Sequence, residues 1–437
     1  MANYFRGNLF KNRVWVPKNI QKPLQNNFCE FSIKYNKSRI KFISKLSKDG
    51  RLVIPKNLCV EKNARIKVNF IPIRNSVRPK SILRSLKIDI LSLIPKTTLT
   101  NFEILAVPKN NSIFVWYFAS KGRPNSIVIN RFLGSNFCRL LGYYRAEGGK
   151  PRISKRRGRE FSFTNKSIYV ITDFINLFGA LANINMLKAS IAYNPSSAKK
   201  LNKIKLHLVK LGVKKLSIRF RKVERVKEYT IRLYVTNSLL SEIIDKAEVT
   251  LRKFILVSKN KNLCVEYLRG VIEGDGSLHS WRDKKGSLHS RLQIFEPNKI
   301  ALDEINKMLE LLGIYGKISK AKTQMYIYSA YLNWNNLLYV YENNLANSKT
   351  NKIRSAIITH KRFNSMKHFL ILPKKFNTSQ FRILTKKSYG YSATWLKDRE
   401  KEGLVKRIVK ENNQNVWVLD GSAKSLISVL QNVKKSS

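Results

Sequence analysis

Two short stretches of the sequence end in an acidic residue followed by glycine, and these acids are candidates for metal chemistry. Residues 140–148 read LLGYYRAEG, and residues 268–276 read LRGVIEGDG. Both follow the order Leu-x-Gly-x-x-x-small-acid-Gly, so Glu147 and Asp275 occupy matching positions. Proteins bind Mg²⁺ through hard oxygen ligands, often one or two carboxylates. The repeat therefore predicts a site for Mg²⁺, or another divalent cation such as Mn²⁺, at Glu147 and Asp275.

The small residues of both stretches predict how the acids are positioned. Gly142 and Ala146 share one face of a helix because they are four positions apart, and the same holds for Gly270 and Gly274. A face without bulky side chains lets a second helix approach closely, as dense interior packing requires. We expect two adjacent helices, related by a pseudo-two-fold axis, with both carboxylates at the same end.

That end is the helix C-terminus, where Gly148 and Gly276 are expected to act as caps. A carboxylate there opposes the helix dipole, at a cost of about 0.3–1 kcal/mol. Two such anions close together also repel each other. A bound cation reverses both penalties, and this favours a metal site.

The two stretches resemble the paired signature motifs of the LAGLIDADG homing endonucleases, and residues 140–148 resemble the archaeal version most. The resemblance implies a single-chain enzyme with a duplicated αββαββα core, whose two antiparallel sheets form a saddle over double-stranded DNA. It also implies metal-dependent hydrolysis of one phosphodiester in each strand. The sequence departs from the family in having Glu147 where Asp is usual, and in having Arg145 and Glu273 two positions before the acids.

The family resemblance further implies an assisting lysine soon after the closing helix of each half. Lys349 and Lys352 fit this place in the second half, and Lys246 or Lys253 fits it in the first. Chance placement is the alternative, because lysine is frequent throughout this chain.

The charge of the chain indicates a polyanionic partner. Its 437 residues include 84 Lys and Arg against 27 Asp and Glu, a formal net charge of +57. Such an excess destabilises a compact state through self-repulsion, so nucleic acid is the expected partner. A ribosomal-type protein is the alternative explanation of this charge.

The sequence gives no sign of secretion or of a membrane segment. No apolar run approaches the roughly 18 residues needed to span a bilayer, and the first residues lack the apolar core of a signal peptide. We expect a monomeric, cytoplasmic, nucleoid-associated protein. Its cysteines are scattered, which argues against a zinc ribbon or a disulfide framework: Cys29, Cys59, Cys138 and Cys264.

Residues 1–125 are expected to form a β-rich accessory domain. Residues 45–58 alternate around Asp49-Gly50, a hairpin signal, and residues 66–71 alternate as well. The pattern resembles the swapped-hairpin DNA-binding domain of AbrB-like regulators, and a β-rich domain without a DNA role is the alternative. Residues 121–130, KGRPNSIVIN, are interpreted as a linker to the next domain.

The sequence after each acidic motif predicts an α+β unit, over residues 126–250 and residues 251–362. A strand at residues 160–164 precedes a helix that Asn165 would cap, and a strand at residues 292–295 precedes a similar helix. The apolar residues of both helices follow the spacing 3, 4, 3: Ile168, Ile171, Ile175 and Phe178 in the first, and Leu302, Ile305, Leu309 and Leu312 in the second.

Each unit is expected to continue with a strand pair and a closing helix. The strand pairs are residues 216–221 with 229–235, and residues 317–322 with 324–330. The closing helices are residues 238–246 and 334–345, and the first unit carries an extra helix at residues 201–211.

Polar side chains on the outer face of these sheets are the predicted DNA contacts, because strands in a major groove can read base edges. A merely solvated surface is the alternative for each residue taken singly. His279 and His289, in a repeated GSLHS, are expected to face each other across a hairpin. The full set is Lys150, Arg152, Arg156, Arg157, Arg159, Ser217, Arg219, Arg221 and Arg232 in the first half, and His279, Arg282, Lys284, Lys285, His289, Arg291, Lys317, Lys320 and Lys322 in the second.

Residues 363–437 are predicted to form a winged helix-turn-helix-like DNA-binding domain. A helix at residues 392–402 is followed by strands at residues 405–409 and 415–419, which turn at Asn412-Asn413. This stretch resembles a recognition helix and its wing, and a small helix–hairpin packing domain is the alternative.

The leading hypothesis is a site-specific, Mg²⁺-dependent double-strand DNA endonuclease, intron-encoded or free-standing. An intein is not expected from a chain that starts MANY and ends KKSS. One alternative is a DNA-binding transcriptional regulator that lost catalysis, and the other is a splicing maturase that binds intron RNA. The presence of both acids favours the nuclease.

Overall fold

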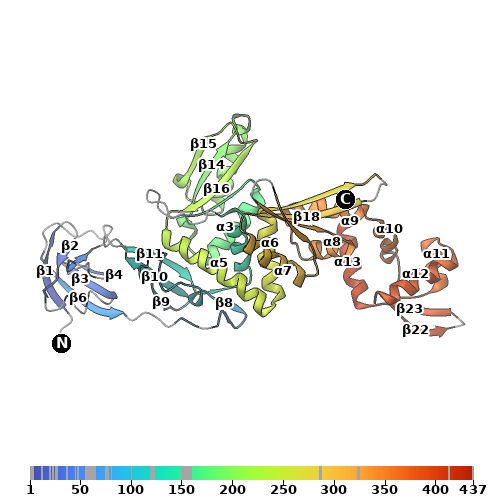
Figure 1. The fold of residues 1–437 in the computed structure, drawn as a ribbon, viewed down its shortest axis with the longest axis horizontal. Coiled ribbons are helices and arrows are strands. Elements are labelled where there is room, and N and C mark those ends of the chain that lie inside the picture. Colours follow the sequence, from blue (N-terminus) through green and yellow to red (C-terminus); the bar gives the residue numbers. More distant parts are fainter. Residues whose placement is uncertain are drawn as a thin grey trace. The chain divides into compact units, whose positions relative to one another are not determined.

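The protein is a mixed α+β chain with several antiparallel sheets, as expected (Figure 1). It divides into two compact units, Met1–Gly274 and Asp275–Ser437, and the boundary directly follows the second acidic motif's helix. No helix among the described residues is long and apolar enough to cross a membrane. The computed structural model describes residues 4–10, 13–18, 21, 24, 28–35, 38–44, 46, 49–54, 65–73, 78–79, 81–99, 101–118, 124–148, 160–284, 288–321, 325–411 and 414–435.

The first unit begins with a six-stranded sheet in the order β4-β3-β6-β1-β2-β5. Alternate residues of its strands form one buried cluster, which includes Phe31, Ile33 and Val68. The strands are β1 Tyr4–Phe10, β2 Arg13–Trp15, β3 Phe28–Tyr35, β4 Ser38–Ser44, β5 Arg51–Val53 and β6 Arg65–Ile73.

The hairpin predicted at Asp49-Gly50 stays a prediction, because residues 45, 47 and 48 before the turn lie outside the described residues. Gly50 adopts a positive φ of 74°, and β5, which follows it, pairs with β2. The turn residues were recognised correctly. Strand partners, however, depend on contacts between residues distant in sequence, which a local pattern does not contain.

Two three-stranded sheets follow, in the orders β11-β10-β9 and β12-β8-β7. The linker expected at residues 121–130 is wrong for its described part, because β11 pairs with β10 from Pro124 to Asn130. The strands are β7 Leu83–Arg84, β8 Lys87–Asp89, β9 Leu105–Lys109, β10 Ser112–Phe118, β11 Pro124–Asn130 and β12 Phe132–Leu133.

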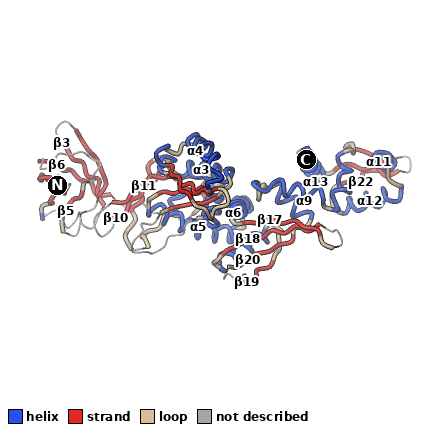
Figure 2. The backbone as a smooth tube through the Cα atoms, turned by 90° about the horizontal axis from the view of Figure 1, so that it is seen from above, coloured by secondary structure: helices blue, strands red, loops and turns tan. Residues whose placement is uncertain are grey.

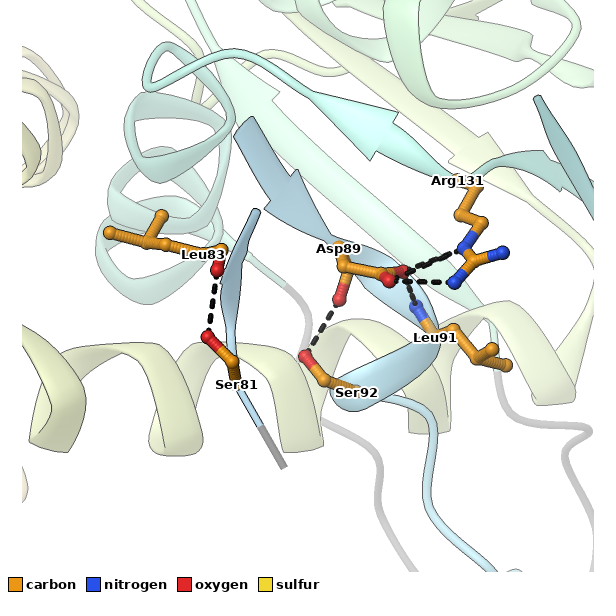
Figure 3. A network of polar contacts seen from close by, with 6 residues as sticks. All are labelled: Ser81, Leu83, Asp89, Leu91, Ser92 and Arg131. Atoms are coloured by element: carbon orange, nitrogen blue, oxygen red, sulfur yellow. Dashed lines mark hydrogen bonds and ion pairs between the residues drawn. The ribbon is translucent and has the colours of Figure 1, made fainter. Parts of the chain in front are cut away.

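A buried ion pair connects Asp89, the last residue of β8, to Arg131, the residue before β12 (Figure 3). The Asp89 carboxylate lies 2.9 Å from the guanidinium of Arg131 and also accepts the backbone N–H of Leu91 at 3.1 Å. The Ser92 hydroxyl donates to the Asp89 carbonyl at 2.7 Å. Because Asp89 is only 1% exposed, these contacts compensate for the burial of its charge.

A four-stranded sheet in the order β13-β16-β14-β15 completes the strands of the first unit. Its strands are β13 Phe161–Asn165, β14 Lys188–Tyr193, β15 Ile218–Lys222 and β16 Tyr229–Val235. The expected pairing of residues 216–221 with 229–235 is wrong. β15 instead pairs with β14 in parallel, and β16 lies between β13 and β14.

The helices of the first unit are α2 Phe137–Glu147, α3 Ile168–Leu181, α4 Leu201–Lys210, α5 Ser238–Ser258 and α6 Lys261–Gly274. The predicted apolar face of α3 is confirmed for Ile171, Ile175 and Phe178, all of which are buried. Its N-cap is Ser167, whose hydroxyl accepts from the Val170 N–H, and not Asn165 as predicted. Asn165 instead accepts the Ser167 N–H at 2.8 Å.

The second unit begins with a four-stranded antiparallel sheet in the order β17-β18-β20-β19 (Figure 2). Its strands are β17 Gly276–Arg282, β18 Leu288–Glu296, β19 Lys317–Lys320 and β20 Tyr326–Tyr331. Helices α7 Lys299–Leu311 and α8 Trp334–Glu342 confirm two predicted helices. Leu302, Ile305 and Leu309 of α7 are buried, as its spacing predicts.

The rest of the second unit consists of short helices around a three-stranded sheet in the order β21-β23-β22. The predicted helix and the two strands after it are observed as α12, β22 and β23, whereas the predicted turn at Asn412-Asn413 lies outside the described residues. The elements are α9 Thr350–Thr359, α10 Lys361–Met366, β21 Lys375–Asn377, α11 Thr378–Thr385, α12 Tyr389–Lys401, β22 Val405–Glu411, β23 Gln414–Leu419 and α13 Gly421–Lys435.

Candidate functional site

Helices α2 and α6 touch backbone to backbone. A Cβ atom added to Gly142 would lie 2.2 Å from the Tyr267 carbonyl oxygen, and one added to Gly270 would lie 2.2 Å from the Arg139 carbonyl oxygen. Both distances are far below van der Waals contact, so no side chain fits at either position. The small residues of the two motifs therefore lie at the contact between the helices, as the spacing predicts.

The same contact continues to the acidic ends of both helices. A Cβ on Gly274 would lie 2.5 Å from the Ala146 Cβ and 3.2 Å from the Glu147 Cγ. Glu147 is the last residue of α2, and Asp275 is covalently joined to Gly274, the last residue of α6. The structure therefore brings Gly274, at the end of α6, next to the side chain of Glu147. Both acidic residues are half-buried.

The two motif glycines that follow the acids differ in their roles. Gly148 is the C-cap of α2, but its φ of −76° and ψ of 139° are extended, not left-handed. A Cβ there would lie 2.2 Å from the Tyr144 carbonyl oxygen, so the reason for glycine is space and not φ. Gly276 is the first residue of β17 and caps no helix. The expected cap is confirmed for Gly148 and wrong for Gly276, because the chain enters β17 directly after Asp275.

Two buried ionic networks hold the helix pair against its neighbours. On one side, the Tyr143 hydroxyl donates to Asp173 of α3 at 2.9 Å, and Arg139 lies 3.3 Å from Asp173 and 3.4 Å from Glu266. Burial, followed by the Asp173 carboxylate, raises the pKa of Tyr143 well above its usual value, so the phenol remains a donor.

The second network joins α6 to α5. The Tyr267 hydroxyl donates to Glu248 at 2.6 Å, and Arg252 pairs with the same carboxylate at 2.7 Å. Burial, followed by Glu248, raises the pKa of Tyr267. These carboxylates are engaged within the protein. Among the described residues no group of three or more His, Cys, Asp or Glu side chains is arranged to hold a metal ion.

Glu147 and Asp275 fit a divalent cation by the chemistry of their donors. Two carboxylates supply hard oxygen atoms, and Mg²⁺ in proteins commonly completes its coordination with water and substrate phosphate oxygens. A third protein carboxylate is therefore not required. The C-terminal ends of two helices also make this position unfavourable for unneutralised acids. Arg145 and Glu273, which precede the acids, are 7% and 4% exposed and belong to the buried part of the helices.

The first four-stranded sheet has one apolar and one polar face. Ile191, Ile231 and Leu233 are buried on the apolar face. On the polar face the register aligns side chains across all four strands, with Arg232 beside Thr164 and Ser190, and Ser190 beside Arg219. Arg221 lies on the same face as Arg219. All three arginines are exposed, and Arg232 forms an ion pair with Glu160.

The second four-stranded sheet has the same division. Leu278, Leu292 and Ile294 are buried, and the opposite face aligns polar residues in rows. One row contains Ser277, Gln293, Ser329 and Lys317, and the next contains His279, Arg291 and Tyr331. The Gln293 amide donates to the Ser329 hydroxyl at 3.0 Å, which fixes its orientation.

The two histidines of the GSLHS repeat do not face each other. His279 pairs with Arg291 and His289 pairs with Trp281, because the register of the hairpin differs from the symmetric one. The His289 ring stacks on Trp281 at 5.7 Å and contacts Asp283 at 3.0 Å.

The remaining predicted DNA contacts are distributed unevenly. Ser217 lies in a 3-10 turn before β15, and Lys284 is an exposed turn residue. Arg282 and Lys320 lie on the face of the second sheet opposite to His279 and Lys317, because side chains alternate along a strand. The others lie outside the described residues: Lys150, Arg152, Arg156, Arg157, Arg159, Lys285 and Lys322.

The candidate lysines lie on helices of each unit. Lys349 immediately precedes α9, which contacts β17 and β18, and Lys352 is exposed on α9. Lys246 and Lys253 are exposed on α5, which extends twelve residues beyond the predicted end of this closing helix, from 246 to 258.

Several polar-face residues were missed by the sequence analysis. Thr164, Ser190, Gln293 and Ser329 align with predicted contacts, and Trp281 and Tyr331 form an aromatic pair at 6.0 Å beside Arg291. The alternation of residues 291, 293 and 295 could have identified Gln293. The partners on other strands could not be identified without the register.

Comparison with solved structures finds LAGLIDADG proteins. Variants of the homing endonuclease I-DmoI match at 19% identity over 45% of this chain and 84% of theirs, with a TM-score of 0.26. I-DmoI in complex with DNA and Mn matches at 16% identity over 51% of this chain and 96% of its own, with a TM-score of 0.25. The N-terminal LAGLIDADG domain of WhiA matches at 15% identity over 50% of this chain and 86% of its own, with a TM-score of 0.31.

These TM-scores are too low to establish a shared overall fold. No protein-family model and no curated protein sequence matches this chain.

Proposed function

We propose that the chain is a site-specific, divalent-metal-dependent DNA endonuclease of the LAGLIDADG type. The observation that carries the proposal is the backbone contact of α2 and α6, which ends at Glu147 on one helix and at the residue before Asp275 on the other. A divalent cation would offset the cost of placing two acids at the C-terminal ends of tightly apposed helices.

A duplicated core is supported by matching positions after each acid. Gly148 pairs with Phe163 of β13, and Gly276 pairs with Ile294 of β18. In each half the N-cap of the next helix lies four residues after this paired residue. The N-cap is Ser167 for α3 and Asn298 for α7. The chain thus goes from acid to paired strand to capped helix with the same spacing in both halves.

The later strands support the same duplication. β16 ends at Val235 and β20 at Tyr331, and in both cases an asparagine two residues later caps the next helix. Asn237 accepts the Leu240 N–H at 3.1 Å, and Asn333 accepts the Asn336 N–H at 2.9 Å. We therefore interpret the second four-stranded sheet, with α6, α7 and α8, as one αββαββα unit. The first is interpreted as a modified copy, in which one described strand lies between α2 and α3 and in which α4 and β15 are added.

In the proposed reaction Glu147 and Asp275 would hold divalent cations, which would activate water and stabilise charge during hydrolysis of one phosphodiester in each strand. The carboxylates position these groups, and no side chain has to act as a nucleophile. The lysines before and on α9 are assigned to the same surroundings on the basis of family resemblance.

The polar faces of the two sheets are proposed to bind double-stranded DNA in its major groove. Arg232, Arg291 and Gln293 have the hydrogen-bonding groups that distinguish G and A by their major-groove edges. Arg219, Arg221 and Lys317 supply positive charge for the phosphates.

Residues 378–419 are proposed to add a winged helix-turn-helix. α11 and α12 contact each other, and the hairpin of β22 and β23 follows them. Tyr391, Thr394 and Lys397 are exposed on α12, and Lys406 and Arg407 are exposed on β22. This places polar and basic groups on the second helix and on the wing, which are the two parts of this motif that face DNA.

The test is cleavage, with and without Mg²⁺, of the DNA that flanks this gene in an allele without the intron or insertion. We expect double-strand cutting that requires Mg²⁺ and is lost in Asp275→Asn. Asp303→Asn, which changes an exposed carboxylate on α7, is the matched control and should cut normally. Specific binding of this DNA without cleavage would indicate a DNA-binding regulator and not a nuclease. Preferential binding of intron RNA would indicate a splicing maturase.

A further inference from the structure

The six-stranded sheet at the start of the chain has a strongly basic outer face. Its six strands contain eight Lys or Arg residues and one acidic residue, Glu30. Glu30 is already paired with Lys41 at 3.0 Å. The inner face forms the buried apolar cluster, and strand alternation directs Arg6, Lys34, Lys41 and Lys67 outward, where all four are exposed.

Strand register places three of these cations in one row. Lys34 of β3 pairs with Lys67 of β6, and Lys67 pairs with Arg6 of β1. Neighbouring strands are about 4.8 Å apart, so the three side chains leave the sheet from adjacent positions, and all three are exposed. Like charges directly opposite each other destabilise a sheet unless a counter-charge binds. The row is therefore suited to a polyanion.

Exposed aromatic rings lie beside these cations. Tyr4 is 44% exposed and Trp15 is 58% exposed, whereas Val14, the neighbour of Trp15 on β2, is buried. The Lys67 ammonium lies 4.2 Å from the Tyr4 ring centre, and the Arg51 guanidinium lies 4.2 Å from the Trp15 ring centre. Each pair offers an aromatic surface and a positive charge at one place.

We propose that this face, defined by Tyr4, Arg6, Trp15, Lys34 and Lys67, binds single-stranded DNA. Cations that follow a backbone and aromatic rings that stack bases are the two components of single-strand recognition on β-sheets. Bases in a duplex are stacked on each other and cannot lie on a ring, so the aromatic residues favour an unpaired strand. The choice of DNA over RNA rests on the proposed function.

The test measures binding of a labelled oligothymidylate by the full-length protein in EDTA. The triple variant Arg6→Ala, Lys34→Ala, Lys67→Ala should bind at least about tenfold more weakly. The slope of log K against log salt should fall by about 2, because each lost phosphate contact with a single strand contributes about 0.7. The matched control Lys87→Ala, Lys109→Ala, Lys199→Ala removes three exposed cations elsewhere in the same unit and should retain the slope.

A second variant tests stacking without a change of charge. Tyr4→Ala with Trp15→Ala should weaken binding by about 5- to 150-fold for each stacked base that is lost, and leave the salt slope unchanged. Equal binding by the triple variant and its control would overturn the proposal. So would a duplex that competes as well as the single strand, or tighter binding of oligouridylate.

Cleavage measurements separate this proposal from the nuclease. The Arg6, Lys34 and Lys67 triple variant should retain Mg²⁺-dependent cutting of duplex DNA, whereas Asp275→Asn should lose cutting and retain oligothymidylate binding. If the natural chain bound oligothymidylate but cut no duplex, the nuclease would be refuted and the single-strand site would remain.

Discussion

The two four-stranded sheets of the core begin alike and end differently. In both, a glycine after the acid pairs with the strand that leads into a capped helix. The second sheet is antiparallel throughout, with β19 and β20 forming a hairpin. In the first sheet β15 pairs with β14 in parallel. The similarity is therefore greatest next to the acids.

The extra helix explains the difference. Parallel neighbours require a crossover connection, usually through a helix, and α4 lies between β14 and β15. In the second half only residues 321–325 separate β19 from β20, and these two strands pair antiparallel. The insertion of α4 and β15 therefore adds an edge strand to the first sheet, while β14 and β16 pair antiparallel as β19 and β20 do.

The largest expected effect concerns the two acids. Glu147→Gln and Asp275→Asn should each reduce the rate of cutting by at least about 1000-fold, roughly 4 kcal/mol in activation free energy, because a carboxylate that holds the cation is lost. Assays on each strand separately would show whether the halves are equivalent. Loss of cutting in both strands with one variant, and no loss with the other, would contradict a duplicated site.

The helix contact should be equally intolerant in both halves. Gly142→Ala and Gly270→Ala should each lower the free energy of unfolding by about 3 kcal/mol, because the added Cβ meets a backbone oxygen at 2.2 Å. Denaturant unfolding measures this. Gly390→Ala is the control, since no atom lies within 4 Å of the added Cβ on exposed α12. A stabilised Gly142→Ala would disprove the backbone contact.

The polar faces should contribute specificity from different residues. Arg232→Ala in the first sheet and Gln293→Ala in the second should each weaken binding of the target by about 1–3 kcal/mol and relax base preference at different positions. Binding to a library of substituted sites would show this. Lys203→Ala, on exposed α4, should leave the preference unchanged. Relaxation at the same position by both variants would contradict separate contacts.

The smallest expected effect concerns Asn237 and Asn333, the N-caps of α5 and α8. Asn237→Ala and Asn333→Ala should each cost about 1 kcal/mol of stability, because each removes the side-chain acceptor for one N–H at a helix start. Thermal unfolding of the variants is the measurement. Asn335→Ala, one position into α8 on the exposed side, should have little effect. Clearly unequal costs for the two caps would mean that the closing helices are not equivalent.

The positions of the helices could be predicted because their signals are local. The spacing of Ile171, Ile175 and Phe178 identified α3, and the small residues of the motifs identified the contact of α2 with α6. Ser167 was missed as a cap because Asn165, two positions earlier, has the same chemistry, and only the start of the helix distinguishes them.

Strand pairing could not be predicted to the same extent. β5 pairs with β2, and β15 pairs with β14. In neither pair do the two strands follow each other directly in the sequence. The faces of strands were predicted better than their neighbours: Ile231 and Leu233 are buried and Arg232 is exposed, as alternation required. Register then decided which predicted contacts share a row.

The outermost strands of the two core sheets carry Arg219, Arg221 and Lys222 on β15 and Lys317 and Lys320 on β19. An outermost strand has unpaired backbone groups that can recruit a strand from another molecule, and charged side chains oppose such recruitment. Electrostatic repulsion between copies therefore protects these margins from aggregation even when no nucleic acid is bound.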